Sequence, residues 1–224
     1  MLPDPTRPEA IRRLFAGIAP RYDLVNRLIS LGRVGRWRER ALKALEVRPE
    51  HLLLDACAGT GELGRRSRAG RVVAVDFSLP MLQAGARHRD RRLWLVCGDA
   101  LRLPLADGCC DRAIVGFSLR NVADVPRFFR EAARVVRPGG RLVSLELTRP
   151  PGRVRSAVHC FCVRRLVPLA GFPGQVGAYR HLAQTVLTFP PPEEVAEWMR
   201  EAGWREVSVI PLSGGICTLH VGER

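Results

Sequence analysis

The middle of the chain alternates short aliphatic runs with segments of helical periodicity. Five apolar runs are bounded by Gly, Asp or Pro residues, as buried strands usually are: 52–55, 71–75, 93–97, 112–117 and 141–147. Helices are expected between them, one beginning after Ser78 and one over residues 125–136. Strands that alternate with helices predict an α/β fold, in which a mostly parallel sheet carries helices on both faces.

The last part of the chain departs from this alternation. Residues 137–140, Arg-Pro-Gly-Gly, predict a tight turn immediately before the strand at 141–147. A helix is expected over 192–202, followed by strands at 206–211 and 216–221. These two strands are close enough in sequence to form an antiparallel pair at the edge of the sheet.

Two segments lie outside the predicted sheet. Residues 9–47 have helical spacing interrupted at Pro20, and we interpret them either as a packing arm or as an N-terminal helical lid over a cofactor. Residues 149–192 form an insert rich in Arg and Pro with an apolar middle. The insert is either a packing helix pair or a substrate-covering lid, suited to a lipophilic molecule and to lying on a bilayer. We expect a single domain over residues 1–224.

The chain is strongly basic, with 36 Lys and Arg residues against 22 Asp and Glu residues and a net charge of +14. Lys43 is the only lysine, and the arginines are spread along the whole chain. This usage is typical of compositional bias as much as of a phosphate-binding surface, so nucleic-acid binding is not expected. Attraction to an anionic membrane face is favoured somewhat more. We expect a cytoplasmic protein, at most peripheral to a membrane.

Cysteine and histidine residues do not predict a metal site. The seven cysteines include no C-x-x-C pair, and the five histidines are scattered. His159, Cys160 and Cys162 are neighbours in sequence but lack a second pair of ligands. No metal is therefore expected.

The segment LLLDACAGTGELG, residues 52–64, predicts a strand that turns sharply into a helix and presents backbone N–H groups to a ligand. Its Gly59, Gly61 and Gly64 also match the G-x-G-x-x-G pattern of dinucleotide sites. In a nicotinamide site, however, the acidic residue lies about 20 positions after the glycine motif, whereas Asp76 follows Gly64 by twelve residues. Asp55 beside the loop would repel a pyrophosphate and suits a cation. We therefore favour S-adenosylmethionine over a dinucleotide.

Further polar residues follow the next predicted strands, at the edge where open parallel sheets bind ligands. Asp76 can accept hydrogen bonds from both ribose hydroxyls, and Met81 can pack against the adenine. Asp99 can accept a hydrogen bond from the adenine amino group. Arg120 and Asn121 follow the fourth strand and are expected to face the substrate.

Four stretches of the sequence resemble a known family. They are residues 22–26 (YDLVN) running on to Trp37, residues 119–124 (LRNVAD), residues 134–140 (RVVRPGG) running on to Glu146, and residues 179–182 (YRHL). Through them the chain resembles, nearly end to end, the class I methyltransferases of menaquinone and ubiquinone biosynthesis. The resemblance implies a Rossmann-like methyltransferase sheet, S-adenosylmethionine as cofactor and a lipophilic quinol as the acceptor of the methyl group at carbon.

The resemblance also implies residue roles. Thr60, Asp76, Asp99 and Ala100 would bind the cofactor beside the backbone of the glycine loop, and Gly116 stands where members often place a cofactor-contacting Ser. The whole predicted cofactor set is Tyr22, Asp55, Gly59, Thr60, Gly61, Asp76, Met81, Asp99, Ala100 and Gly116.

Four residues are predicted to act on the substrate. Arg120 and Asn121 would hold and polarise the quinol oxygen, while Asp23 and Tyr179 would close the site, and Asp23 or a bound water would take the proton. The chain departs from the family pattern at His181, where members usually have Tyr.

Other readings of the sequence stay open. A class I methyltransferase of another lipophilic or phenolic molecule, including the ubiquinone-pathway benzoquinol, would share the cofactor residues. A nucleic-acid-binding module would fit the charge. The sequence leaves open whether the ring is a naphthoquinol or a benzoquinol, and whether the chain forms a homodimer.

Overall fold

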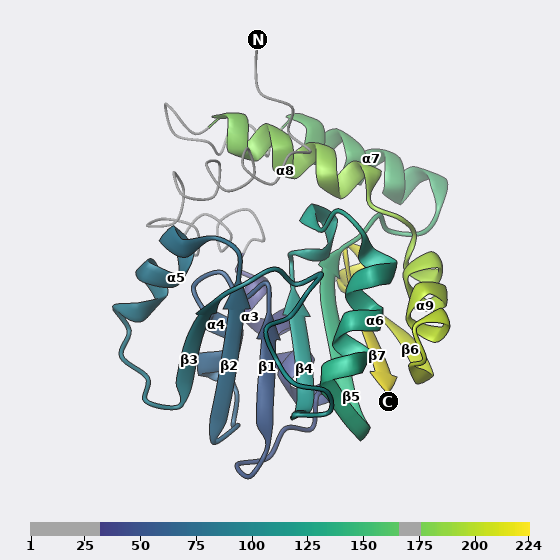
Figure 1. Cartoon of the computed structure of the whole chain (residues 1–224). Coiled ribbons are helices and arrows are strands. Elements are labelled where there is room, and N and C mark those ends of the chain that lie inside the picture. Colours follow the sequence, from purple (N-terminus) through teal and green to yellow (C-terminus); the bar gives the residue numbers. More distant parts are fainter. Residues whose placement is uncertain (1–31, 166–175) are drawn as a thin grey trace.

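A computed structural model describes residues 32–165 and 176–224, which form a seven-stranded sheet in the order β3-β2-β1-β4-β5-β7-β6 (Figure 1). The strands are β1 Leu52–Ala56, β2 Arg71–Asp76, β3 Leu93–Cys97, β4 Cys110–Gly116, β5 Val136–Leu147, β6 Arg205–Leu212 and β7 Cys217–Glu223. β1 to β5 pair in parallel, and β7 pairs antiparallel with both β5 and β6. The predicted mostly parallel sheet with an antiparallel carboxyl-terminal edge is confirmed.

Helices cover both faces of the sheet, as predicted. They are α3 Val34–Ala44, α4 Glu62–Arg66, α5 Leu79–Ala86, α6 Val125–Val135, α7 Arg153–Arg165, α8 Val176–Thr188 and α9 Pro192–Glu201, with short 3₁₀ turns η2 Leu119–Asn121 and η4 Ser213–Gly215. Because successive side chains of a strand point to opposite faces, Leu53 packs with Trp37 of α3, while Leu54 packs with Phe128 of α6. The two faces of the sheet thus have separate hydrophobic cores.

The start of β5 differs from the prediction. The strand begins at Val136, the last residue of the predicted helix, and runs through the stretch expected to be a tight turn, because Val136 already pairs with Cys110 of β4. The register then shifts, and Arg112 pairs with Arg141. Gly139 has a positive φ of 75° in this irregular stretch, and its N–H donates to the carbonyl of Arg224. The Pro-Gly-Gly segment is therefore a β-bulge inside a strand.

α7 and α8, from the predicted insert, lie across the carboxyl ends of the parallel strands (Figure 1). Val163 of α7 packs with Ala183 and Val186 of α8, and Leu147 at the end of β5 packs against this cluster. Within residues 32–165 and 176–224, no helix is long and apolar enough to cross a bilayer. Residues 9–31 of the predicted N-terminal lid lie outside the described part of the chain.

Two carboxylates fix the loop between β1 and α4. Asp55 Oδ2 accepts from the N–H of Gly64 at 2.8 Å, and Asp76 Oδ2 accepts from the N–H of Gly59 at 2.7 Å. Asp76 Oδ1 also accepts from the N–H of Ser78 at 2.8 Å, which ties the loop to the start of α5. Gly59 and Gly61 have φ values of 57° and 76°, where a side chain would be strained.

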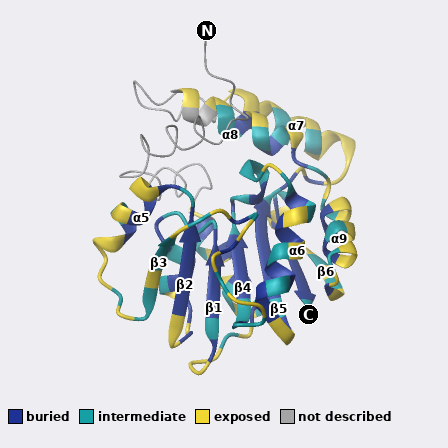
Figure 2. Cartoon of the chain, viewed as in Figure 1, coloured by how far each residue is buried: buried dark blue, intermediate teal, exposed yellow. Residues whose placement is uncertain are grey.

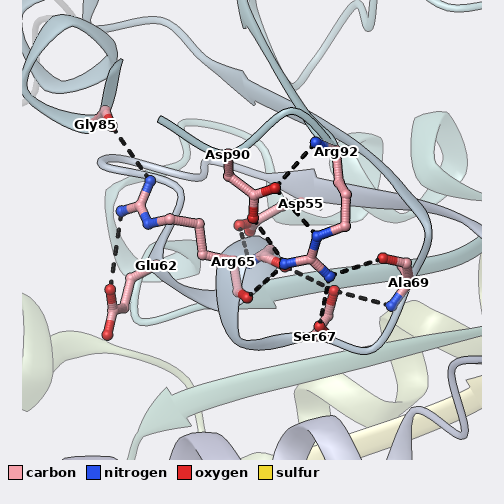
Figure 3. A network of polar contacts seen from close by, with 9 residues as sticks. Asp55, Glu62, Arg65, Ser67, Ala69, Gly85, Asp90 and Arg92 are labelled. Carbon is pink, nitrogen blue, oxygen red and sulfur yellow. Dashed lines mark hydrogen bonds and ion pairs between the residues drawn. The ribbon is translucent and has the colours of Figure 1, made fainter. Parts of the chain in front are cut away.

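α4 has only five residues, and arginines satisfy polar groups around it (Figure 3). The guanidinium of Arg92 donates to the carbonyls of Arg65, Ser67 and Ala69 at 3.0–3.2 Å, and it pairs with Asp90. Carbonyls at the end of a helix have no partner within the helix, so these bonds stabilise its last turn. The short helix thus holds the loop in place.

α5 approaches the loop so closely that Gly85 leaves no space for a side chain. A Cβ at Gly85 would lie 2.3 Å from the carbonyl oxygen of Thr60. We expect Gly85→Ala to push α5 away from the loop and to lower the free energy of unfolding by about 1–3 kcal/mol. Urea unfolding of the purified variant measures this loss.

The control is Gly35→Ala. Gly35 is also helical, but a Cβ there has no atom within 4 Å, so the substitution should leave stability unchanged or raise it by up to about 1 kcal/mol. Equal stability of the two alanine variants would contradict the close approach of α5 to Thr60.

The stability of the free protein should fall as the pH rises from about 4 to 7 because of Asp55. Burial is the main cause that raises the pKa of Asp55 to about 7, against the lowering effect of the Gly64 N–H. In this window the carboxyl of the unfolded chain has lost its proton and that of the folded protein retains it. The free energy of unfolding therefore falls by up to about 4 kcal/mol across the window. Asp55→Asn keeps the acceptor for Gly64 and should lack this dependence. If stability depended on pH in the same way in both proteins, the raised pKa of Asp55 would be contradicted.

Candidate functional site

Carboxylates from four strand ends surround the glycine loop. They act on the partly buried Cys57 thiol, whose pKa is raised well above its usual value by desolvation first and then by Asp76, Asp55, Asp99 and Glu146. These acids follow or end β2, β1, β3 and β5. We call the end of the sheet where the parallel strands terminate its carboxyl edge. This edge is therefore a region of negative potential, and a cation bound there would be stabilised.

Asp76 is fixed at the end of β2, and its role toward a ribose stays a prediction. Its side chain lies at the end of β2 and is held by the N–H groups of Gly59 and Ser78. A carboxylate offers about four lone-pair directions, so these two bonds are compatible with further donors such as ribose hydroxyls. The fixed carboxylate is thus oriented before a ligand arrives.

Met81, Asp99 and Ala100 lie at the same edge of the sheet as the loop. Met81 is buried, and its Cε would be 3.1 Å from a Cβ added to Gly59. Asp99 is exposed beyond β3 and accepts from the N–H of Leu101 at 2.9 Å, whereas Ala100 is buried. The structure therefore brings together the predicted cofactor residues from the first three strand ends, and their contacts with a cofactor stay predictions.

Two predicted cofactor residues have local packing that the sequence did not indicate. Asp55 is buried behind the loop, where it holds Gly64, so its influence on a ligand would be electrostatic. A Cβ at Gly116 would lie 2.5 Å from Cδ1 of Leu63. The Leu63 side chain thus occupies the space that the usual Ser of the family would need.

A buried ion pair lies beside the loop. The guanidinium of Arg120 in η2 donates from Nη1 to Glu146 Oε1 at the end of β5, and the two side chains are only 4% and 0% exposed. Glu146 also accepts from the backbone N–H of Leu147 at 2.8 Å. The Nε of Arg120 is buried and has no hydrogen-bond partner among the residues that the structure describes. One N–H of the guanidinium is therefore left to bind an oxygen of a ligand.

Asn121 is joined to the insert. Its Oδ1 lies 3.2 Å from Nε2 of His181 on α8, across 60 positions of sequence. Burial, and next the charge of Arg120, lower the pKa of His181 below 6.5, so its imidazole is neutral at pH 7. When Nε2 carries the proton it donates to Asn121, and the Asn121 NH₂ group is then directed elsewhere as a donor. η2 and α8 together thus form one polar cluster.

The predicted substrate residues are only partly placed by the structure. Arg120 and Asn121 adjoin each other at the carboxyl edge, as expected, but Tyr22 and Asp23 lie outside the described residues, and so does the side chain of Tyr179. Sequence reasoning missed the roles of Glu146 and His181. Glu146 was recognisable as an acid at a strand end, and His181 as a departure from the family pattern, but neither signal names its partner.

Solved structures of low sequence identity share the fold. A SAM-dependent methyltransferase from Thermotoga maritima is 19% identical with a TM-score of 0.68, covering 94% of this chain and 98% of that one. A SAM-dependent methyltransferase from Aquifex aeolicus is 17% identical with a TM-score of 0.62, covering 89% and 96%. These structures support the class I methyltransferase sheet and helices described above.

Closer relatives match over almost the whole chain. The demethylmenaquinone methyltransferase of Roseiflexus sp. (strain RS-1) is 41% identical over 231 residues, which cover 99% of this chain and 97% of the relative. The demethylmenaquinone methyltransferase of Thermus thermophilus is 40% identical over 221 residues, covering 94% and 100%. The ubiE/COQ5 methyltransferase family matches residues 5–224. This match takes in the glycine loop, the Arg120–Glu146 pair and the insert helices, and the chain belongs to the ubiE/COQ5 methyltransferase family.

Proposed function

We propose that this methyltransferase transfers the methyl group of S-adenosyl-L-methionine to a ring carbon of demethylmenaquinol. Family membership supports methyl transfer, and relatives 41% and 40% identical carry the name demethylmenaquinone methyltransferase. The observation that carries the proposal is the polar cluster of Arg120, Glu146, Asn121 and His181 beside an acidic loop. It places donors for a substrate oxygen next to a site for a cation.

The carboxyl edge suits the sulfonium cofactor. Asp76 and Asp99 provide the negative potential, to which the buried Asp55 adds as it loses its proton near pH 7, and the backbone of Gly59 and Gly61 allows a close approach. In our proposal Asp76 binds the ribose, Asp99 and Ala100 bind the adenine, and Met81 packs against it. When bound, the cofactor supplies an activated methyl group, so the protein contributes mainly by positioning the two reactants and excluding water.

Activation of the quinol is assigned to the polar cluster. The hydroxyl of a quinol has a phenol-like pKa of about 10, and its ring carbon becomes a good nucleophile when the hydroxyl loses its proton. The free Nε–H of Arg120 and the NH₂ group of Asn121 can stabilise the resulting oxyanion. Glu146 holds the guanidinium in place, and His181 orients the amide. Asp23, or a bound water, takes the proton.

The insert and the N-terminal segment act as covers in this proposal. α7 and α8 lie over the carboxyl edge, and α8 contributes His181 to the site. Tyr22, Asp23 and Tyr179 would complete the closure, and the part of residues 9–47 that precedes α3 would then exclude water from the reacting atoms together with residues 149–192. Apolar covers of this kind would suit a lipophilic quinol.

Methyl transfer from labelled S-adenosyl-L-methionine should occur with reduced demethylmenaquinone in detergent. Reduced benzoquinol precursor, offered side by side, distinguishes the menaquinone role from a dual role. The matched control is the oxidised quinone, whose ring is a poor nucleophile and should accept no methyl group. Absence of product from either quinol, while the cofactor still binds, would refute the proposed substrate.

The buried ion pair allows the role of Arg120 to be separated from its effect on stability. Arg120→Ala should lower kcat about 100-fold or more, but it also leaves Glu146 buried and unpaired, at a cost of about 3–5 kcal/mol in stability. The double variant Arg120→Met, Glu146→Gln removes both charges and keeps an acceptor for the Leu147 N–H. We expect near-normal stability and low kcat.

Arg141 provides the control for this test. It pairs with Glu223 at 2.5 Å at the opposite edge of the sheet, so Arg141→Met, Glu223→Gln should leave kcat unchanged. Steady-state kinetics and urea unfolding are measured on both double variants. A kcat like that of the wild type in the Arg120 double variant would show that the guanidinium does not act on the substrate.

A further inference from the structure

The outer face of α7 carries an exposed apolar stripe. Val154, Val158 and Phe161 are 77%, 58% and 63% exposed, and their spacing of four and three residues places them on one side of the helix. Val163 lies about half a turn away and is buried against α8. α7 therefore has two apolar faces, one packed on the protein and one turned outward. Figure 2 shows that α7 carries both buried and exposed positions.

Arginines flank this stripe on both sides. With 100° per residue, Arg155 lies to one side of it and Arg153 and Arg164 to the other, while Arg165 continues the stripe itself. The whole insert, residues 149–192, contains no Asp or Glu. Its basic residues are Arg149, Arg153, Arg155, Arg164, Arg165 and Arg180. Long arginine side chains can keep their charge at an aqueous boundary while apolar neighbours enter a less polar phase.

The stripe lies on the same side of the molecule as the site. α7 and α8 cover the carboxyl edge of the sheet, where the loop and the polar cluster are (Figure 1). The other large apolar side chains that are exposed in the described part of the chain, Leu79, Trp94 and Ile210, come from three different elements. The combination of an apolar stripe and flanking cations is thus particular to this edge.

We propose that the outer face of α7 docks the protein on an anionic lipid bilayer. Val154, Val158 and Phe161 enter the headgroup region, and the flanking arginines pair with lipid phosphates. The purpose of this docking rests on the proposed function, because a lipophilic quinol resides in the bilayer. Docking through α7 turns the carboxyl edge of the sheet, with its covering helices, toward that quinol. The docking itself is a binding event that needs neither cofactor nor quinol.

The charge and the apolar stripe of α7 together favour a lipid bilayer over a nucleic acid or a second copy of the chain as its partner. A nucleic acid would use the arginines and could stack a base on Phe161, but it gains nothing from Val154 and Val158, which continue the stripe. A second copy of the chain would bring arginines of the same face together, and their repulsion opposes association. An anionic bilayer satisfies both features of α7.

The test is co-sedimentation of the full-length protein with vesicles of phosphatidylcholine, alone or mixed with phosphatidylglycerol, without quinol or cofactor. Binding is expected to the mixed vesicles and to weaken with salt. Arg164→Gln, Arg165→Gln should weaken it roughly 30-fold. Val158→Ser, Phe161→Ser should weaken it roughly tenfold.

Matched controls come from other surfaces. Arg48→Gln, Arg71→Gln removes two exposed charges near the amino ends of β1 and β2, and Ile210→Ser removes an exposed apolar side chain on β6. Both should bind the vesicles like the wild type. Equal weakening by the controls and the α7 variants would overturn the proposal, because binding would then follow net charge or general stability.

Three further results would overturn it. The first is that the wild type does not bind mixed vesicles. The second is that the protein forms a dimer, which Phe161→Ser dissociates without any effect on vesicle binding. The third is that the protein binds RNA in a salt-sensitive way and does not bind vesicles. Turnover in detergent is measured on the wild type in parallel. Methyl transfer without vesicle binding would reject the docking surface alone, whereas vesicle binding without methyl transfer would reject the proposed function alone.

Discussion

Crowding of carboxylates at one edge of the sheet is the constraint on which the site depends. Asp55 and Asp76 are needed there for structural reasons, since their oxygens hold the N–H groups of Gly64 and Gly59 and so fix the loop. Glu146 holds Arg120 in the same region. The mutual repulsion of these buried acids is relieved by backbone N–H groups, by protons, by arginines such as Arg120, or by a cationic ligand. A protein that selects a sulfonium compound can thus use the same groups for folding and for recognition.

The sequence predicted best what depends on neighbours along the chain. The strand, loop and short helix of residues 52–66 follow from a local pattern, and the antiparallel edge follows from the short connection between β6 and β7. The predicted start of β5 was wrong. The bulge around Gly139 depends on the pairing of Val136 with Cys110 and on the bond from Gly139 to Arg224, and no local pattern indicates these contacts. The Pro-Gly-Gly composition favoured a turn, and the sheet incorporated it as an irregular strand.

The substrate side of the site shows the same limit. Arg120 and Asn121 could be placed near the cleft because they follow a central strand, but their partners could not be named. The pairing of Gly116 with Leu145 brings the end of β5 beside η2, and this register makes Glu146 the partner of Arg120. His181 reaches Asn121 only because α8 folds back over the sheet. Both contacts are long-range consequences of the fold, which sequence patterns do not contain.

Cys57 has a chemical consequence for a protein that handles an activated methyl group. Its sulfur belongs to the glycine loop itself and would be a strong nucleophile as a thiolate. Burial and the surrounding carboxylates raise its pKa, so the sulfur stays protonated. The negative field that attracts the sulfonium therefore also suppresses a competing nucleophile in the loop, and the loop is protected from alkylation by the compound that it binds.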